Sequence, residues 1–114
     1  MSVKLNTRQV GDVTVMDVAG RITLGEGSSA LRDAVRAMVT GGHKKILLNL
    51  GEVSYIDSSG IGELVSGFTS VTNSGGQLKL LNLTKRVKDL LQITKLYTVF
   101  DVHDSEVSAI RSFT

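Results

Sequence analysis

Residues 55–64 read Tyr-Ile-Asp-Ser-Ser-Gly-Ile-Gly-Glu-Leu. The apolar run Ile46-Leu47-Leu48-Asn49-Leu50 precedes them, and apolar residues at helical spacing follow them. A continuously apolar run of this length is typical of a buried strand in a parallel sheet. The segment is therefore predicted to place two hydroxyls and two glycines at the N-terminus of a surface helix.

The polar part of this segment exceeds what a helix cap requires. One Asp or Ser at the N-cap satisfies first-turn amides and is worth ~1 kcal/mol, whereas Asp57, Ser58 and Ser59 offer three such side chains. Gly60 and Gly62 follow at once, although a glycine inside a helix costs up to ~1 kcal/mol relative to alanine. We therefore expect another surface to approach closely at this helix start.

Strands and helices are predicted to alternate along the rest of the chain. Strands are expected over residues 3–8, 13–18, 44–50 and 77–83 and at Val99-Phe100, and helices after a cap at Ser28 or Ser29, from Ser58 to Ser74, after Thr84, and after Asp104 or Ser105. Residues 20–27 are expected to form a loop with three glycines.

This order predicts an α/β fold in a single domain, residues 1–114. Alternating strands and helices favour a mostly parallel sheet with right-handed crossovers. The short link at Gly11-Asp12 makes the first two strands an antiparallel hairpin. We expect a mixed, mostly parallel sheet of four to five strands, about four helices and an N-terminal β-hairpin.

Composition excludes several classes of protein. The chain has no cysteine, which excludes a disulfide scaffold, a thiolate metal site and a cysteine nucleophile. Since no apolar run approaches the ~18 residues of a membrane span, and residues 1–5 alternate instead of forming a signal-peptide core, we expect a soluble, cytoplasmic protein without membrane contact. The net charge is +2 and aromatic residues make up 4% of the chain, so direct nucleic-acid binding is not expected. Lys85, Arg86 and Lys88 form the one basic cluster, which is interpreted as a solvated helix face.

Few residues could support catalysis. A serine nucleophile needs a base within reach, and the chain has only His43 and His103. His43 is expected at the opposite edge of the sheet from Ser58, and His103 in the C-terminal region. The HExxH, EF-hand and Walker A patterns are all missing from the sequence. The sequence therefore predicts no catalytic residue, no metal site and no cofactor.

One glycine-rich stretch offers an alternative. Residues 25–30 read Gly-Glu-Gly-Ser-Ser-Ala and match G-x-G-x-x-A between a strand and a helix, a place where helix amides can bind phosphate. However, the stretch follows the second strand of a hairpin, not the opening strand of a βαβ unit. A loop leading into a Ser cap is the favoured interpretation, and a small nucleotide-binding enzyme is the alternative.

Residues 55–62 resemble the signature of STAS-domain anti-sigma factor antagonists, the group that includes bacterial SpoIIAA- and RsbV-type regulators. The resemblance covers nearly the whole chain and implies the STAS fold. Residues 13–20 are similar to the family's second strand, residues 46–50 to its central strand, and residues 75–78 to its glycine turn into the next strand.

The resemblance implies a non-enzymatic partner switch. In the family, the first serine of the motif, here Ser58, is phosphorylated by a serine kinase that is also an anti-sigma factor. The unphosphorylated protein binds that kinase and frees a sigma factor, and a PP2C-type phosphatase resets the switch. Asp57 would cap the helix and orient the site, while Ser59, Gly60 and Gly62 would shape the partner contact surface.

Thr23 departs from the family pattern. Many members carry an acid after the apolar residue in the loop that follows the second strand, whereas Thr23 follows Ile22 here. We expect this loop to lie near Ser58, with Thr23 at the rim of the partner surface. The alternative within the same family is a STAS scaffold or transporter-accessory subunit without a phosphorylation cycle.

Overall fold

The computed structural model describes residues 3–113 and confirms the predicted α/β fold. The elements are β1 (Val3–Val10), β2 (Val13–Ile22), α1 (Glu26–Thr40), β3 (Lys45–Ile56), α2 (Ser58–Asn73), β4 (Gln77–Leu81), α3 (Lys85–Ile93), the 3₁₀ turn η1 (Tyr97–Val99), β5 (Val102–His103) and α4 (Glu106–Ser112). The five strands lie in the order β1-β2-β3-β4-β5. The β1-β2 pair is the predicted antiparallel hairpin, and the remaining pairs are parallel.

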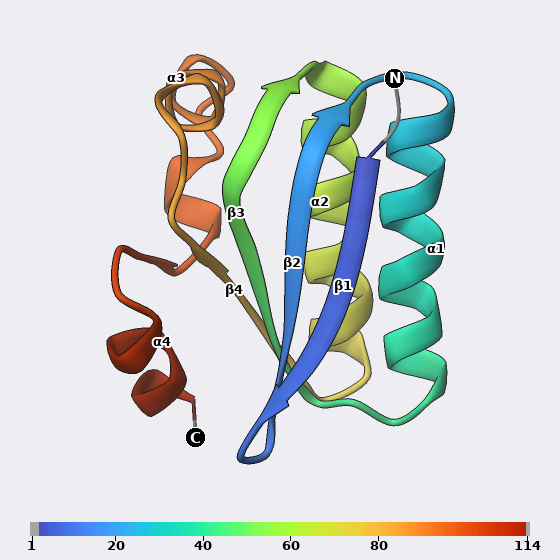
Figure 1. Cartoon of the computed structure of the whole chain (residues 1–114), viewed down its shortest axis with the longest axis vertical. Coiled ribbons are helices and arrows are strands. Elements are labelled where there is room, and N and C mark those ends of the chain that lie inside the picture. The colour runs from blue at the N-terminus through green and yellow to red at the C-terminus, as the bar shows by residue number, and fades with distance from the viewer. Residues whose placement is uncertain (1–2, 114) are drawn as a thin grey trace.

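The two faces of the sheet are covered unequally. Figure 1 shows α1 and α2 along one face, where the main core packs strand residues such as Leu48 against Leu31 of α1 and Leu64 of α2. On the other face, Ala109 of α4 and Phe113, which follows the helix, are buried over the amino-terminal parts of β2 and β3. The carboxyl-terminal parts of β2 and β3 carry no helix of residues 3–113 on that face (Figure 1).

The first helix begins earlier than predicted. Its first residue is Glu26, and Gly25 occupies the N-cap with φ 102° and no side-chain cap hydrogen bond. The prediction that Ser28 or Ser29 caps this helix is therefore wrong, and the loop expected over residues 20–27 shrinks to residues 23–25. Ser28 lies inside the helix, is only 5% exposed, and its hydroxyl bonds Ser59 in another part of the chain.

The last strand is also displaced from its predicted position. Tyr97–Val99 forms η1, and Phe100 is buried with its ring edge against Phe68 at a centroid distance of 5.5 Å. The apolar pair Val99-Phe100 was thus wrongly predicted as a strand. The strand is Val102–His103, which pairs with the end of β4 and is too short to show a period in the sequence.

The central strand runs beyond its predicted end at Leu50. It continues to Ile56, and Ile22 pairs with Ile56 in the β2-β3 register. The loop after β2 and the start of α2 therefore emerge side by side. Thr84 caps α3 as predicted. Of the two predicted candidates for the last helix, Asp104 and Ser105, Ser105 caps α4.

Candidate functional site

The polar segment lies where β2 and β3 end. Asp57 is the N-cap of α2, and Ser58 is the first residue of the helix. The Asp57 amide donates to the Ile22 carbonyl at 3.3 Å, which ties the helix start to the end of β2. Ser58 is exposed, and its hydroxyl makes no hydrogen bond with any part of residues 3–113. This hydroxyl is therefore open to modification.

Asp57 organises the surroundings of Ser58. Its Oδ1 accepts the Gly60 amide at 3.0 Å and the Ser59 hydroxyl at 2.6 Å, and its Oδ2 accepts the Leu24 amide at 3.0 Å. Burial alone would raise the pKa of Asp57, but these hydrogen bonds outweigh it and hold that pKa below its usual value. One ionised carboxylate thus fastens the β2-α1 loop to the first turn of α2, in line with the capping role predicted for it.

The second serine of the motif is engaged inside the fold. Ser59 donates to Asp57, and its Oγ also lies 2.8 Å from the Oγ of Ser28 in α1. Of the two adjacent serines, only Ser58 keeps a free hydroxyl toward solvent. The sequence did not reveal this link, because the pattern around Ser28 is also that of a helix cap.

The two glycines of the motif serve different purposes. A Cβ on Gly60 would lie 2.5 Å from the Ile22 carbonyl oxygen and 2.6 Å from Cγ1 of Ile56. Gly60 is therefore small because β2 and β3 pack against it, which corrects the expectation that its lack of a side chain serves an external surface. Gly62 is exposed, with nothing within 4 Å of an added Cβ, and it remains available to a partner.

The loop after β2 lies beside the motif, as predicted. Thr23 is half-buried, and its carbonyl accepts the Ser28 amide at 3.0 Å. The next residue, Leu24, gives its amide to Asp57 while its side chain is 82% exposed. The sequence did not single out Leu24, because one apolar residue in a loop carries no signal of a contact by itself.

Comparison with known proteins places this arrangement in a family. The sequence model of the STAS domain matches residues 4–109. The chain belongs to the STAS domain family. Its relatives in that family include the anti-sigma-B factor antagonist of Bacillus subtilis (strain 168), which is 31% identical over 102 residues, or 90% of this chain and 92% of the relative.

Solved structures share the fold of this STAS domain. An anti-sigma factor antagonist from Mycobacterium paratuberculosis matches with a TM-score of 0.86 and 18% identity, over 97% of this chain and 93% of that one. The Bacillus cell fate determinant SpoIIAA in its phosphorylated form matches with a TM-score of 0.74 and 20% identity, over 95% and 97%. The resemblance to SpoIIAA- and RsbV-type anti-sigma factor antagonists, a group of non-enzymatic regulators, is thereby confirmed.

The histidines of this STAS domain lie away from Ser58. His43 bonds Thr14 at 2.8 Å near the amino ends of β2 and β3, as predicted. His103 uses one nitrogen, Nε2, for both Asp101 at 3.1 Å and Ser112 at 3.4 Å. A Ser-His-Asp relay needs the two ring nitrogens for different partners, so this cluster attaches α4 to the sheet and is not a triad.

Neither a metal-ligand cluster nor a membrane-spanning helix occurs within residues 3–113. The described residues hold no group of three or more His, Asp or Glu side chains that could hold a metal ion. Every helix in the described part of the STAS domain is too short or too polar to cross a bilayer.

The glycine-rich stretch at residues 25–30 is not a phosphate cradle. The Ser28 amide already donates to the Thr23 carbonyl, and a Cβ on Gly27 would lie 2.5 Å from the carbonyl oxygen of Arg21. The stretch therefore packs against the end of β2, which leaves no space for a phosphate at Gly27 and removes the basis for the nucleotide-binding alternative.

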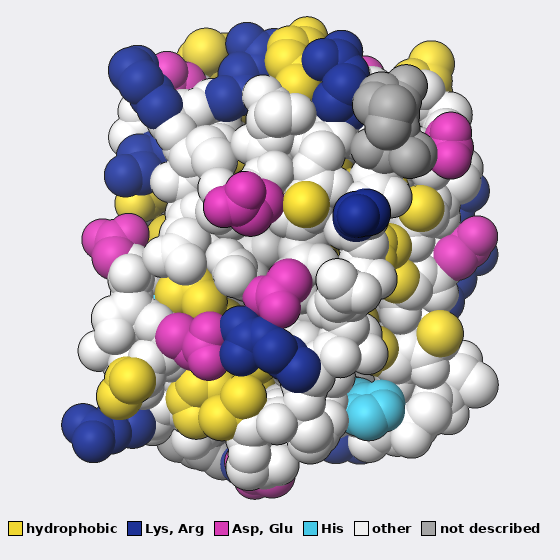
Figure 2. All heavy atoms as spheres, in the orientation of Figure 1, with side chains coloured by type: hydrophobic (Ala, Val, Ile, Leu, Met, Phe, Trp, Pro, Cys, Tyr) yellow, Lys and Arg dark blue, Asp and Glu magenta, His cyan; other side chains and the backbone are white. Residues whose placement is uncertain are grey.

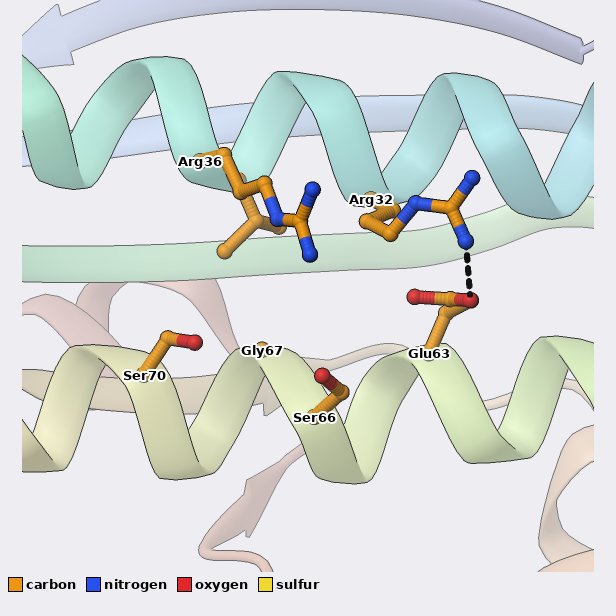
Figure 3. Close-up of a pocket in the computed structure, with 7 residues that line it drawn as sticks. Arg32, Arg36, Glu63, Ser66, Gly67 and Ser70 are labelled. Carbon is orange, nitrogen blue, oxygen red and sulfur yellow. Dashed lines mark hydrogen bonds and ion pairs between the residues drawn. The ribbon is translucent and has the colours of Figure 1, made fainter.

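A hollow between α1 and α2 is also too small for a nucleotide. Figure 3 shows Arg32 and Arg36 of α1 across from Ser66 and Ser70 of α2, with Arg32 paired to Glu63 at 3.3 Å. The volume open to water is about 10 Å³, which is roughly the room of one water molecule.

The Asp57 carboxylate should make the stability of the site depend on pH. Because its pKa is lower in the folded than in the unfolded chain, its contribution is present above about pH 3.9 and is lost as pH falls through the folded value. Replacement by Asn keeps a cap acceptor but removes the charge, whereas replacement by Ala removes the cap and is expected to cost ~1 kcal/mol at pH 7.

Urea unfolding of the wild type, Asp57→Asn and Asp57→Ala at pH 7 and near pH 3 measures this contribution. We expect the gap between wild type and Asp57→Asn to narrow at the lower pH, since below about pH 3.9 the unfolded wild-type chain gains a proton at Asp57 that the folded chain resists. An equal gap at both pH values would show that the charge of Asp57 does not stabilise the fold.

Proposed function

We propose that this STAS domain is an anti-sigma factor antagonist that binds an anti-sigma factor kinase while unphosphorylated and is switched off by phosphorylation of Ser58. The observation that carries the proposal is the exposed, unbonded hydroxyl of Ser58 beside the fully engaged hydroxyl of Ser59. A kinase that reached this helix start would find one free acceptor hydroxyl there.

The domain is suited to carry a phosphate at this position. A phosphate at a helix N-terminus is stabilised by the helix dipole, typically by 0.3–1 kcal/mol. Asp57 adds a nearby negative charge, but its two oxygens already accept hydrogen bonds from Gly60, Ser59 and Leu24. Phosphorylation should therefore leave the free domain folded.

The partner surface would centre on the same place. Ser58, Gly62 and Leu24 are all exposed around the start of α2, with Thr23 at the rim. Inside an interface, the phosphate dianion would be desolvated or set against like charge. A PP2C-type phosphatase would remove it, and the cycle would take place in the cytoplasm. Phosphorylation of Ser58 would therefore leave the free domain stable but weaken its complex with the partner.

Intact-mass measurement tests the modification. The protein is incubated with ATP and the purified anti-sigma factor kinases of its source organism, and we expect a gain of one phosphate on the wild type. Ser58→Ala should gain none, while Ser59→Ala should still be modified, because Ser58 is the one of these two serines with a free hydroxyl. If Ser58→Ala gained as much phosphate as the wild type, the proposal would be overturned.

Measuring binding to the same purified kinases, together with the mass gain, addresses the scaffold alternative. A wild-type protein that binds no anti-sigma factor and takes up no phosphate would favour a STAS subunit that acts as a scaffold or transporter accessory.

A further inference from the structure

Two arginines from different elements share one tyrosine ring. The Arg21 guanidinium carbon, at the end of β2, lies 4.7 Å from the ring centroid of Tyr55, and that of Arg86, in the first turn of α3, lies 4.4 Å from it. Both arginines are exposed and Tyr55 is half-buried. We call Arg21, Tyr55 and Arg86 the basic clamp.

The basic clamp lacks an acidic partner in the described fold. Neither of its guanidiniums forms an ion pair within residues 3–113. Several other cations are paired: Arg8 with Asp17 and Glu106, Arg32 with Glu63, Lys45 with Asp12, Lys79 with Asp101, and Lys85 with Asp89. The clamp thus holds two like charges on one ring with their N–H donors unused by acids, an arrangement that a bound anion would stabilise.

Lys85 and Arg86, two members of the basic cluster at residues 85–88, make different contacts in the structure. Lys85 is paired with Asp89 of its own helix, an ordinary surface pair. Arg86 instead packs on Tyr55 of the central strand. Arg86 is exposed, as a solvated face requires, but it also has a fixed neighbour in Tyr55.

The clamp adjoins the proposed partner surface. Arg21 pairs in register with Tyr55, one position before Ile22 pairs with Ile56 and the chain turns into Asp57 and α2. Figure 2 shows Lys and Arg side chains gathered around an apolar one along the top edge of the molecule, over the ends of β2 and β3 and over α3. A partner that covered Ser58 and Leu24 would thus extend over the clamp.

We propose that the basic clamp is the docking site for an acidic segment of the anti-sigma factor, with Asp or Glu carboxylates of the partner bound by Arg21 and Arg86. This inference rests on the proposed function. A planar guanidinium stacked on a ring keeps its edge free for a carboxylate and loses little freedom on binding. Arginine and tyrosine are also, with tryptophan, enriched among the residues that carry interface energy. The clamp would set which anti-sigma factor is recognised.

Calorimetric titration against the purified anti-sigma factor kinases of the source organism tests the clamp. The double variant Arg21→Ala/Arg86→Ala is compared with Arg36→Ala/Arg111→Ala, which removes the same charge from α1 and α4. We expect the clamp variant to bind about 100-fold more weakly and the control to bind within about threefold of wild type. Arg21→Lys and Arg86→Lys, each made singly, should bind more tightly than the double alanine variant. Lysine keeps the positive charge but lacks the guanidinium edge that binds a carboxylate through two hydrogen bonds.

Salt dependence gives a second measurement. Wild-type affinity should fall as NaCl rises, and the clamp variant should show a flatter dependence because its charged contacts are gone. Circular dichroism at each step establishes that the variants are folded.

The outcomes separate the two proposals. If the wild type binds a kinase and both double variants bind equally well, the docking role of the clamp is overturned while the proposed function stands. If the wild type binds none of the kinases, the proposed function is overturned, and the docking role falls with it.

Discussion

Phosphorylated protein is expected to bind its anti-sigma factor kinase roughly 30-fold to several thousand-fold more weakly than unphosphorylated protein. Breaking complementarity at a buried polar contact costs roughly 2–5 kcal/mol, and each 1.4 kcal/mol corresponds to about tenfold in affinity. Ser58 is exposed at the first position of α2, so a partner that covers it must desolvate the added dianion. The free domain loses nothing comparable, because the helix N-terminus favours negative charge.

A pair of matched variants isolates the charge from the size of the added group. Ser58→Glu and Ser58→Gln are nearly isosteric, and only the first carries a negative charge. We expect Glu to weaken binding well beyond Gln in calorimetric titration, and thermal unfolding of the two free variants to differ little. Equal binding by Glu, Gln and the wild type would contradict a switch that works through charge at this position.

Replacing Gly60 with Ala is expected to lower the free energy of unfolding by roughly 1–3 kcal/mol, the usual cost of overpacking a tight site. The added Cβ would lie 2.5 Å from the Ile22 carbonyl oxygen, which belongs to the strand backbone and cannot rotate away. The start of α2 must then move off the sheet, and Ser58 and the Asp57 cap move with it. Urea unfolding measures the loss, and partner binding should weaken in parallel.

Gly62 supplies the control in the same turn of the same helix. Nothing lies within 4 Å of a Cβ added there, and alanine is favoured over glycine in a helix by up to ~1 kcal/mol. Gly62→Ala is therefore expected to raise the free energy of unfolding while Gly60→Ala lowers it. If both variants shifted in the same direction, the contact between Gly60 and Ile22 would not be the reason for the glycine.

Much of the site could be predicted because its signals are local. Asp57 stands between a buried strand and an apolar helical repeat, and its side chain accepts the amide three residues on, as an N-cap does. The same local rules placed the cap at Thr84 and narrowed the last cap to Asp104 or Ser105, of which the fold uses Ser105. They failed at Ser28, where a cap-like pattern lies inside a helix whose start is set by contact with β2.

Pairs of residues distant in sequence could not be predicted in the same way. The bond between Ser28 and Ser59 joins residues 31 positions apart, and neither serine alone signals a partner. Tyr55 and Arg86 belong to separate elements that meet only when α3 folds beside β3. The two-residue strand β5 likewise exists because β4 offers it a neighbour.

The sequence by itself determined the alternation of strands and helices, the opening hairpin, the cap at Asp57 and the position of Ser58 at a helix start. These follow from periodicity and from hydrogen bonds within a few residues. Only the tertiary structure decided that Ser58 is the free serine, that Gly60 is small because of its own sheet, and that Arg21 and Arg86 meet on Tyr55. The parallel pairing of β2 with β3 brings Ile22 to Gly60 and Arg21 to Tyr55. The packing of α1 beside α2 and of α3 beside β3 adds Ser28 and Arg86.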